Sequence, residues 1–376
     1  MKVVTFSEHL YGIGLLTKAL IYPGTLLEAH KPYLLSLHQY NALCNESSNT
    51  FMRQISDAWP LLRELHVEAE GKGRDVLLYN DVGGMGDMVM MWPLAQILHK
   101  RGYKVHILLR PGYEHLWVGF PWIESVIILP THWNTIQRFH GHVFFEFLTN
   151  YYMHQDQGHP LDIMLQKVGI DPNEIPDSEK RVIPNFTFWE NEMGRNLYKG
   201  KKLAFFQLSA SQHSRSLSPE QTRNLLLSLA KAFPELHWIG LYGLKIAPAY
   251  YVPALSEPNV EFRMFEKIRI LWSLLRRAEV CIGPDSMLIH AAGTQGIPCV
   301  GLWGTHDPST RVKYYPKHFP IFLSEKCAQS PCYWLASTMP TFCPDEIPDR
   351  RYCGVLQAIT EEMVIAKVRE ALSSKA

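Results

Sequence analysis

The sequence predicts an α/β protein with two doubly wound domains, a cleft between them and an N-terminal extension. Its 376 residues are too many for a single hydrophobic core. Two series of short apolar runs alternate with helix-compatible stretches, which is the pattern of parallel sheets covered on both faces. A polar, proline-containing segment at 171–184 separates the two series. We therefore assign residues 1–70 to an extension of unknown fold, 71–195 to a first Rossmann-like domain and 196–376 to a second.

The elements of the first half follow from apolar periodicity. The run 2–6 predicts a strand in the extension, and apolar residues at helical spacing, beginning with Phe51 and Ile55, predict a helix over 48–68. The glycines of residues 71–73 indicate a linker. Beyond it, strands are predicted at 76–79, 105–109, 126–129 and 143–147, and helices at 87–100 and 160–168.

The second half repeats the alternation of strands and helices. Ser218 is the expected N-cap of a helix, and Pro219 suits its first position. The last helix is amphipathic, with Val364 and Val368 on its apolar face. Strands are predicted at 203–208, 237–241, 280–282 and 298–302, and helices at 219–233, 268–278 and 360–372.

Composition narrows the functional class. Hydrophobic residues make up 47% of the chain and charged residues 19%, as in globular proteins. The formal net charge is +1, so there is no electrostatic footprint for nucleic acid. Glu8, His9 and Lys18 interrupt the apolar residues at the start of the chain, and we expect neither a signal peptide nor a transmembrane segment. These observations favour the cytoplasm.

The most informative motif follows the apolar run that ends at residue 282. Gly283 and Pro284 form a turn that delivers Asp285 and Ser286 to the start of a helix-compatible segment. Free N–H groups and the positive end of the helix dipole meet at such a point, which suits a phosphate or diphosphate. His290 lies about one helical turn further, on the same face. An ordinary capped turn is the alternative, but the clustering of three polar types favours a binding site.

The first domain carries a glycine-rich turn between a predicted strand and helix. Gly84 and Gly86 allow the backbone to approach a ligand closely. Asp87 would sit at the helix start, where its carboxylate could accept a proton from a hydroxyl group. A role only as the helix cap is equally compatible with the sequence.

A dinucleotide site competes for the same turn. Gly84, Gly86 and Val89 nearly fit the Gly-x-Gly-x-x-Gly pattern, but the third glycine is missing. Arg110, at the end of the next strand, could meet the 2′-phosphate of NADP. This interpretation leaves the cluster from Asp285 onward without a role.

A second polar loop follows the strand at 203–208. Ser209, Ser211 and Arg215 could bind a diphosphate leaving group, and a solvated loop is the alternative. The sequence has neither a phosphate-binding P-loop motif nor an Asp-x-Asp pair for a divalent cation. We therefore expect no catalytic metal, with the leaving group stabilised by helix ends and cations.

The cysteines fall into two groups. Cys281 and Cys299 lie in apolar runs and are expected in the core. The other group lies in a proline-rich segment at 327–353 and could hold one structural zinc or iron ion, with unpaired thiols as the alternative. Its members are Cys327, Cys332, Cys343 and Cys353.

Together these residues resemble glycosyltransferase family 9, the ADP-heptose heptosyltransferases. The resemblance extends over about residues 75–372, and the cysteine segment is similar to the iron-binding cysteines of autotransporter heptosyltransferases, with a different spacing. Met287 stands where the family has glycine. The matching positions are Gly86, Asp87 and Pro93 in the first domain, and Asp285, Ser286, His290, Gly296 and Pro298 in the second, followed by the turn 302–308 and the approach 353–364 to the last helix.

The resemblance implies a GT-B fold and inverting transfer of a heptose or related hexose from a nucleotide-diphosphate donor such as ADP-heptose. By motif match, Asp87 would be the general base, and Asp285, Ser286 and His290 would bind the donor, with Arg215 as the nearest cation. The acceptor hydroxyl could belong to a glycan, a protein or a small molecule. Two alternatives remain, an NADP-dependent oxidoreductase and a non-catalytic nucleotide-sugar-binding protein. The oligomeric state is open, a homo-oligomer included.

Overall fold

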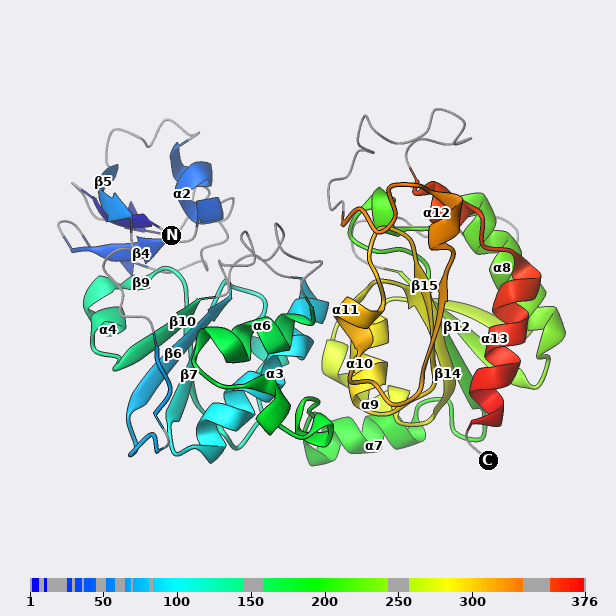
Figure 1. The fold of residues 1–376 in the computed structure, drawn as a ribbon, viewed down its shortest axis with the longest axis horizontal. Helices are drawn as coiled ribbons and strands as arrows, with labels where there is room; N and C mark the ends of the chain where they lie inside the picture. The colour runs from blue at the N-terminus through cyan, green and yellow to red at the C-terminus, as the bar shows by residue number, and fades with distance from the viewer. Residues whose placement is uncertain are drawn as a thin grey trace. The chain divides into compact units, whose positions relative to one another are not determined.

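The computed structural model (Figure 1) forms two compact units. The first comprises Met1–Gly83, Met91–Tyr151 and Met164–Ile175, and the second comprises Gly84–Met90, Tyr152–Ile163 and Pro176–Ala376. The domain boundaries expected at residues 70 and 195 stay predictions. The structure describes residues 2–6, 10–11, 26–28, 31–35, 37–44, 52–57, 65–68, 70–80, 84–144, 158–242, 257–333 and 352–374.

The first unit contains a parallel sheet with strand order β10-β6-β7-β8. Strand β6, in the interior of this sheet, is buried from Val76 to Tyr79, which explains the continuous apolar run in the sequence at these positions. Helix α3 (Met85–Lys100) follows β6 in the chain and buries Trp92. The strands are β6 (Asp75–Asn80), β7 (Lys104–Leu109), β8 (Ile123–Ile128) and β10 (Gly141–Phe144).

The N-terminal extension contributes three strands to an antiparallel sheet with order β5-β1-β4-β9, whose edge strand β9 comes from residues 131–132. The helix predicted over 48–68 is wrong, because residues 52–57 form a strand that pairs with β1. Pairing with a distant strand outweighed the local helical spacing. The elements are β1 (Lys2–Phe6), β4 (Tyr33–Leu35), β5 (Met52–Asp57) and β9 (Thr131–His132), with the pair β2 (Leu10–Tyr11) and β3 (Leu26–Leu27), α2 (Leu37–Cys44) and α4 (Trp133–Gln137).

The second unit is built on a six-stranded parallel sheet with order β13-β12-β11-β14-β15-β16. The chain moves outward from β11 in one direction, then returns to β14 and moves outward in the other. This order places the topological switch point between β11 and β14. The strands are β11 (Lys202–Gln207), β12 (Leu236–Leu241), β13 (Val260–Arg263), β14 (Ala278–Pro284), β15 (Cys299–Trp303) and β16 (His318–Phe322).

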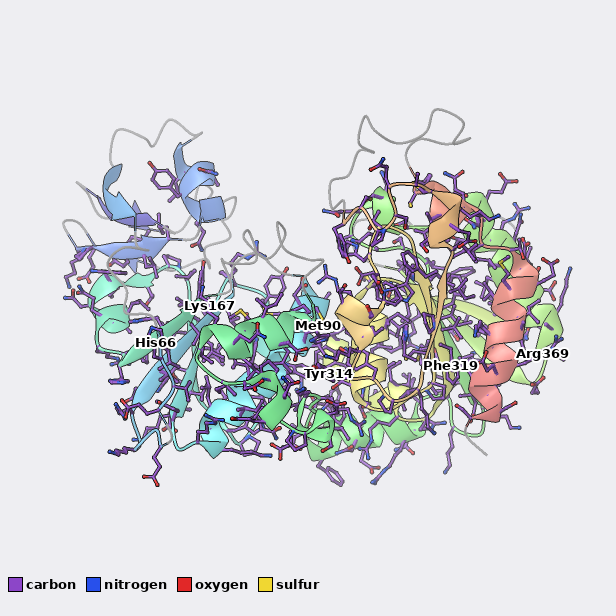
Figure 2. The ribbon with its side chains drawn as sticks, viewed as in Figure 1. His66, Met90, Lys167, Tyr314, Phe319 and Arg369 are labelled. Carbon is purple, nitrogen blue, oxygen red and sulfur yellow. The ribbon has the colours of Figure 1, made fainter. Side chains whose placement is uncertain are left out.

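Helices cover both faces of this sheet (Figure 1). On one face, α8 and α13 share a core in which Leu229, Val364 and Val368 are fully buried. Phe319 on β16, labelled in Figure 2, packs against the same core. On the other face lie α9 and α10. The helices are α6 (Pro160–Lys167), α7 (Phe188–Asn196), α8 (Pro219–Ala232), α9 (Ile268–Leu275), α10 (Met287–Thr294), α11 (Ser309–Val312), α12 (Gly354–Gln357) and α13 (Glu361–Ser373).

Most predicted elements of the two sheets are confirmed to within two residues at their ends. Ser218 caps α8 as expected, and its side chain accepts from the Gln221 N–H. The helix predicted to reach residue 278 is wrong at its end, because α9 stops at Leu275 and Ala278 already begins β14. Residues 145–147 of one predicted strand lie outside the described residues. No helix in the described part of the chain has both the length and the apolar character to cross a membrane.

Candidate functional site

The candidate site lies at the switch point of the six-stranded sheet. Strands β11 and β14 are direct neighbours, so the loop after β11 and the turn after β14 leave the same edge side by side. Gly283 permits this proximity, because a Cβ there would lie 2.7 Å from the Gln207 Cβ. The two polar segments singled out in the sequence therefore meet.

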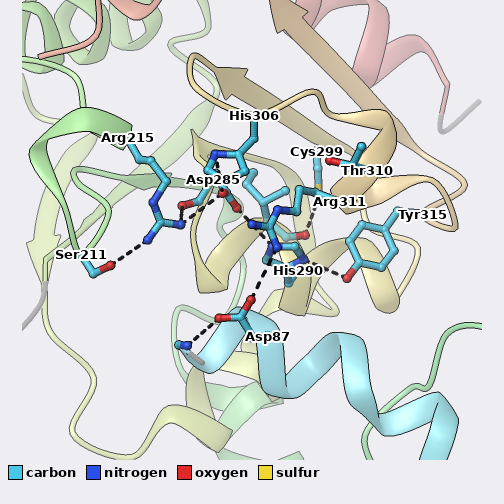
Figure 3. Close-up of polar contacts among 12 residues, drawn as sticks. Asp87, Ser211, Arg215, Asp285, His290, Cys299, His306, Thr310, Arg311 and Tyr315 are labelled. Carbon is cyan, nitrogen blue, oxygen red and sulfur yellow. Dashed lines mark hydrogen bonds and ion pairs between the residues drawn. The ribbon is translucent and has the colours of Figure 1, made fainter. Parts of the chain in front are cut away.

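Asp285 is the centre of this site (Figure 3). Its carboxylate, with a side chain only 8% exposed, lies 3.1 Å from Arg215 Nη1 and 3.4 Å from His290 Nε2. Arg215 also donates to the Asp285 carbonyl at 3.3 Å and, through Nη2, to Ser211 Oγ at 2.9 Å. Burial alone would raise the pKa of Asp285, but the charge of Arg215 and the hydrogen bond from His290 hold it well below its usual range. Asp285 is therefore a carboxylate that orients a cation and an imidazole.

Two histidines extend the site toward β15 and its following turn. His290 Nδ1 lies 3.0 Å from the Tyr315 hydroxyl. His306 Nδ1 lies 3.9 Å from Asp285 Oδ2 and 2.8 Å from Thr305 Oγ1. Burial and the charge of Arg311 hold the pKa of His306 well below its usual range, so this ring is neutral near pH 7. His306 is therefore a neutral hydrogen-bonding group beside the Asp285 carboxylate.

Several buried polar atoms at the site have no hydrogen-bond partner among the described residues. They include Ser286 Oγ, Arg215 Nε and Gln212 Oε1. Ser286 is the N-cap of α10, yet its side chain makes no capping bond. An unsatisfied buried polar group costs about 1–3 kcal/mol, so such a cluster points to a ligand that completes it. A helix N-terminus with a free hydroxyl and a nearby guanidinium suits an anion.

Asp87 lies in the first turn of α3. This turn belongs to the second unit, which includes Gly84–Met90. Its Oδ2 accepts from the Gly84 N–H at 2.6 Å, and its Oδ1 lies 3.6 Å from Arg311 Nη1. The side chain is 21% exposed. A Cβ on Gly86 would lie 2.6 Å from the His290 ring, so glycine allows α3 to approach α10. The side chain thus supports the helix start, which is the capping role, and also faces a cation.

Ser209 is the predicted residue that stays apart from this group. It is buried in the loop after β11, where its carbonyl accepts from Gln207 Nε2 at 3.1 Å. Within the described residues it forms no hydrogen bond with Asp285 or Arg215. Ser211, Arg215, Asp285 and His290 are joined by direct contacts, and Ser286 follows Asp285 at the start of α10.

Sequence reasoning missed His306, Arg311 and Tyr315. All three follow β15, whose carboxyl end adjoins that of β14. The signal that could have found them is their position, because polar residues after the strand next to β14 share its edge. Arg110, the proposed NADP contact, instead lies over the Tyr113 ring at 5.3 Å.

Residues 327–333, the described beginning of the cysteine segment, pack against the turn that carries His306. Ser330 Oγ donates to the Gly304 carbonyl at 3.4 Å, and the Tyr333 N–H donates to the Thr305 carbonyl at 2.7 Å. The Tyr333 ring meets the His306 ring edge-on at 5.5 Å. The described residues 327–333 are therefore in contact with the turn that carries His306, beside the Asp285 site.

Three of the four predicted metal ligands, Cys327, Cys332 and Cys353, lie among the described residues. Burial, with a smaller effect of Cys332 and Cys327, raises the pKa of Cys353 to about 11. Cys343 lies outside the described residues. No group of three or more His, Cys, Asp or Glu side chains in the described part of the chain is placed to hold a metal ion. Cys281 and Cys299 are buried in the core, as predicted.

Part of the second unit matches a known protein family. Residues 267–338 match the model of glycosyltransferase family 9 (heptosyltransferase). The resemblance to this family is confirmed. The matched segment contains the Asp285 turn and the His306 turn. A search of the curated proteins found no match.

Solved structures share the fold at low sequence identity. ADP-heptose lipopolysaccharide heptosyltransferase II of Escherichia coli has 12% identity and a TM-score of 0.58, over 80% of this chain and 99% of that one. A family 9 glycosyltransferase of Veillonella parvula has 13% identity and a TM-score of 0.59, over 81% and 99%. TibC of enterotoxigenic E. coli, an iron-containing dodecameric glycosyltransferase, has 14% identity and a TM-score of 0.59, over 86% and 79%. The protein therefore has a GT-B fold.

Proposed function

We propose that the protein is an inverting glycosyltransferase that moves a sugar from a nucleotide-diphosphate donor to a hydroxyl acceptor. The observation that carries the proposal is the group of Arg215, Asp285 and His290 beside the start of α10. There, Ser286 Oγ and Arg215 Nε are buried without partners in the described chain. A diphosphate supplies the acceptor atoms that both groups lack.

In this proposal the donor diphosphate binds at the N-terminus of α10. Ser286 and Ser211 donate hydroxyl hydrogen bonds, and Arg215 neutralises charge, with Ser209 and Gly283 shaping the loop and strand end. Asp285 and His290 support the donor site indirectly, because Asp285 is buried and already paired with Arg215. As the glycosidic bond breaks, negative charge grows on the diphosphate, and the guanidinium with the helix dipole stabilises it. No divalent cation takes part in this step.

Asp87 is the proposed general base. Its Oδ2 is held by the Gly84 N–H at 2.6 Å, which leaves Oδ1 to accept a proton. The acceptor oxygen forms a bond to the anomeric carbon as its proton passes to Asp87, and the nucleoside diphosphate leaves from the opposite face, so the configuration inverts. Gly84 and Gly86 belong to the proposed acceptor loop, in which Gly84 would leave room for the acceptor and Gly86 lets the loop lie against the His290 ring.

The proposed donor is ADP-heptose or a related nucleotide sugar. One structure of TibC, covering 94% of this chain and 87% of that one at a TM-score of 0.58, is described as a complex with ADP-D-β-D-heptose. The acceptor in our proposal is a hydroxyl of a glycan, a protein or a small molecule. Self-association belongs to the same proposal, since TibC is described as dodecameric.

We also propose that Cys327, Cys332, Cys343 and Cys353 hold one structural zinc or iron ion. The support for it is the pattern of the four cysteines in the sequence, since Cys343 lies outside the described residues and the described residues alone form no metal-binding group. Such an ion would supply a cross-link, because four protein ligands leave no open position for substrate.

The test is calorimetric titration of the purified protein with ADP and ADP-heptose, followed by an assay for ADP release. We expect ADP to bind, and Arg215→Met to weaken binding at least about tenfold, ~1.4 kcal/mol. Arg195→Met, which changes an exposed arginine on α7, should bind ADP normally. If neither ligand binds at millimolar concentration, the proposed function is wrong. Binding without sugar transfer to any acceptor hydroxyl would favour a non-catalytic nucleotide-sugar-binding protein.

A further inference from the structure

We infer that Arg311 is a positioning residue for Asp87, one that holds the carboxylate in place for proton transfer. This inference rests on the proposed function, in which Asp87 is the base. Arg311 belongs to α11, and its side chain is only 3% exposed. A buried guanidinium is costly unless it meets a negative charge, and the Asp87 carboxylate lies within ion-pair distance of this one.

The distances suit a base better than a closed salt bridge. Asp87 Oδ2 is fixed by a short hydrogen bond from the Gly84 N–H, at 2.6 Å. Oδ1 lies 3.6 Å from Arg311 Nη1, which is close enough for attraction but beyond a normal hydrogen bond. Arg311 therefore orients the carboxylate while Oδ1 keeps a lone pair for an acceptor hydroxyl (Figure 3).

The backbone of Arg311 is itself held by a buried histidine. His159 Nδ1 accepts from the Leu161 N–H at 3.2 Å, so its Nε2 carries the proton and donates to the Arg311 carbonyl at 3.2 Å. Burial lowers the pKa of His159 to about 3, which keeps the ring neutral and this tautomer in place. Nearby, the Tyr314 hydroxyl donates to the Asp162 carboxylate at 2.5 Å. The cation is thus fixed through its backbone, not only through its charge.

Arg311 also lies near Asp285 and helps to lower its pKa. Asp285, however, already has its own guanidinium, Arg215, at 3.1 Å. A role in donor binding and a role in positioning the base therefore predict different losses. Loss of a donor contact raises the dissociation constant of the donor, whereas loss of a positioning contact lowers kcat.

The test is a double-mutant cycle that combines Arg311→Met with Asp87→Asn. We expect Arg311→Met alone to lower kcat about 10–100-fold, since a misplaced group costs up to about 10²-fold. The dissociation constant of ADP should stay within about threefold of wild type. In the Asp87→Asn background the same change should have no further effect on kcat, because its target is already lost. Arg195→Met serves as the control for loss of an arginine elsewhere.

Folding is checked by the melting temperature, and Arg311→Lys carries the same comparison if the Met variant melts early. A kcat that is unchanged in Arg311→Met overturns the inference, as does an equal loss in both backgrounds. A rise in the ADP dissociation constant that accounts for the whole effect overturns it as well. If Asp87→Asn itself turns over normally, the general-base proposal fails. If Asp87→Asn is inactive while Arg311→Met is fully active, the positioning role of Arg311 is wrong and the general-base proposal stands.

Discussion

At the scale of single residues, two glycines of one turn differ in what a side chain would meet. A Cβ on Gly86 would lie 2.6 Å from the His290 ring, whereas a Cβ on Gly84 would lie 3.6 Å from Asp87 Oδ2, an ordinary contact. The His290 ring is buried and bonded to Asp285 and Tyr315, so it has little freedom to move. Substitution of Gly84 is therefore a matched control for substitution of Gly86.

We predict that Gly86→Ala weakens ADP binding at least about tenfold, or ~1.4 kcal/mol, by displacing His290 from Asp285. Alanine gains about 1 kcal/mol over glycine inside a helix, so intrinsic helix propensity acts in the opposite direction. Gly84→Ala should bind ADP within about threefold of wild type. Calorimetric titration of both variants decides, and equal affinities for the two would contradict the contact.

At the scale of elements, α11 depends on the proton state of His159. The folded chain keeps this imidazole neutral down to pH about 3, while the unfolded chain takes up a proton below its ordinary pKa of 6.5. Between these values the unfolded state binds more protons, so the free energy of unfolding falls as pH falls.

We predict that acidification from pH 6.5 to pH 5 costs up to about 1.4 kcal/mol of stability per pH unit through His159. The stability of His159→Gln should depend less steeply on pH in this window. Urea unfolding of both proteins at several pH values measures the slope. His132→Gln, which changes a histidine with a 45% exposed side chain, is the control. Identical slopes in wild type and His159→Gln would rule out this origin of the acid sensitivity.

The cysteine segment is the second element with a testable role. We predict about one equivalent of zinc or iron per chain in protein purified without added metal, and loss of that metal in Cys332→Ser. Cys281→Ala, in the core on β14, should keep the metal. Elemental analysis that finds less than a small fraction of an equivalent of metal would contradict this site.

Sugar transfer should need no added Mg²⁺, since the proposed leaving-group site uses Arg215 and a helix end. Activity that is lost with EDTA and restored by Mg²⁺ would contradict this expectation.

At the scale of the whole molecule, the sequence predicts the buried strands of the two parallel sheets and the residues that meet at their edges. Strands buried on both faces read as continuous apolar runs, so those at 76–79 and 280–282 were found from sequence. The proximity of Arg215 and Asp285 followed from the shared edge of parallel strands. The antiparallel strand β5 was mistaken for a helix, because its pairing partner lies far away in the chain. Arg311 was missed for a similar reason, since its partner Asp87 belongs to a distant segment.

The grouping of the first turn of α3 with the second unit has a consequence for biosynthesis. Residues 84–90 leave the ribosome long before the strands of the second sheet, yet their neighbours His290 and Arg311 come from that sheet's last connections. Contacts of such high sequence separation form late and slowly. A nascent chain shorter than about residue 311 therefore cannot assemble the base with its cation. Asp87 can therefore meet its cation only after Arg311 has been synthesised and has left the ribosome.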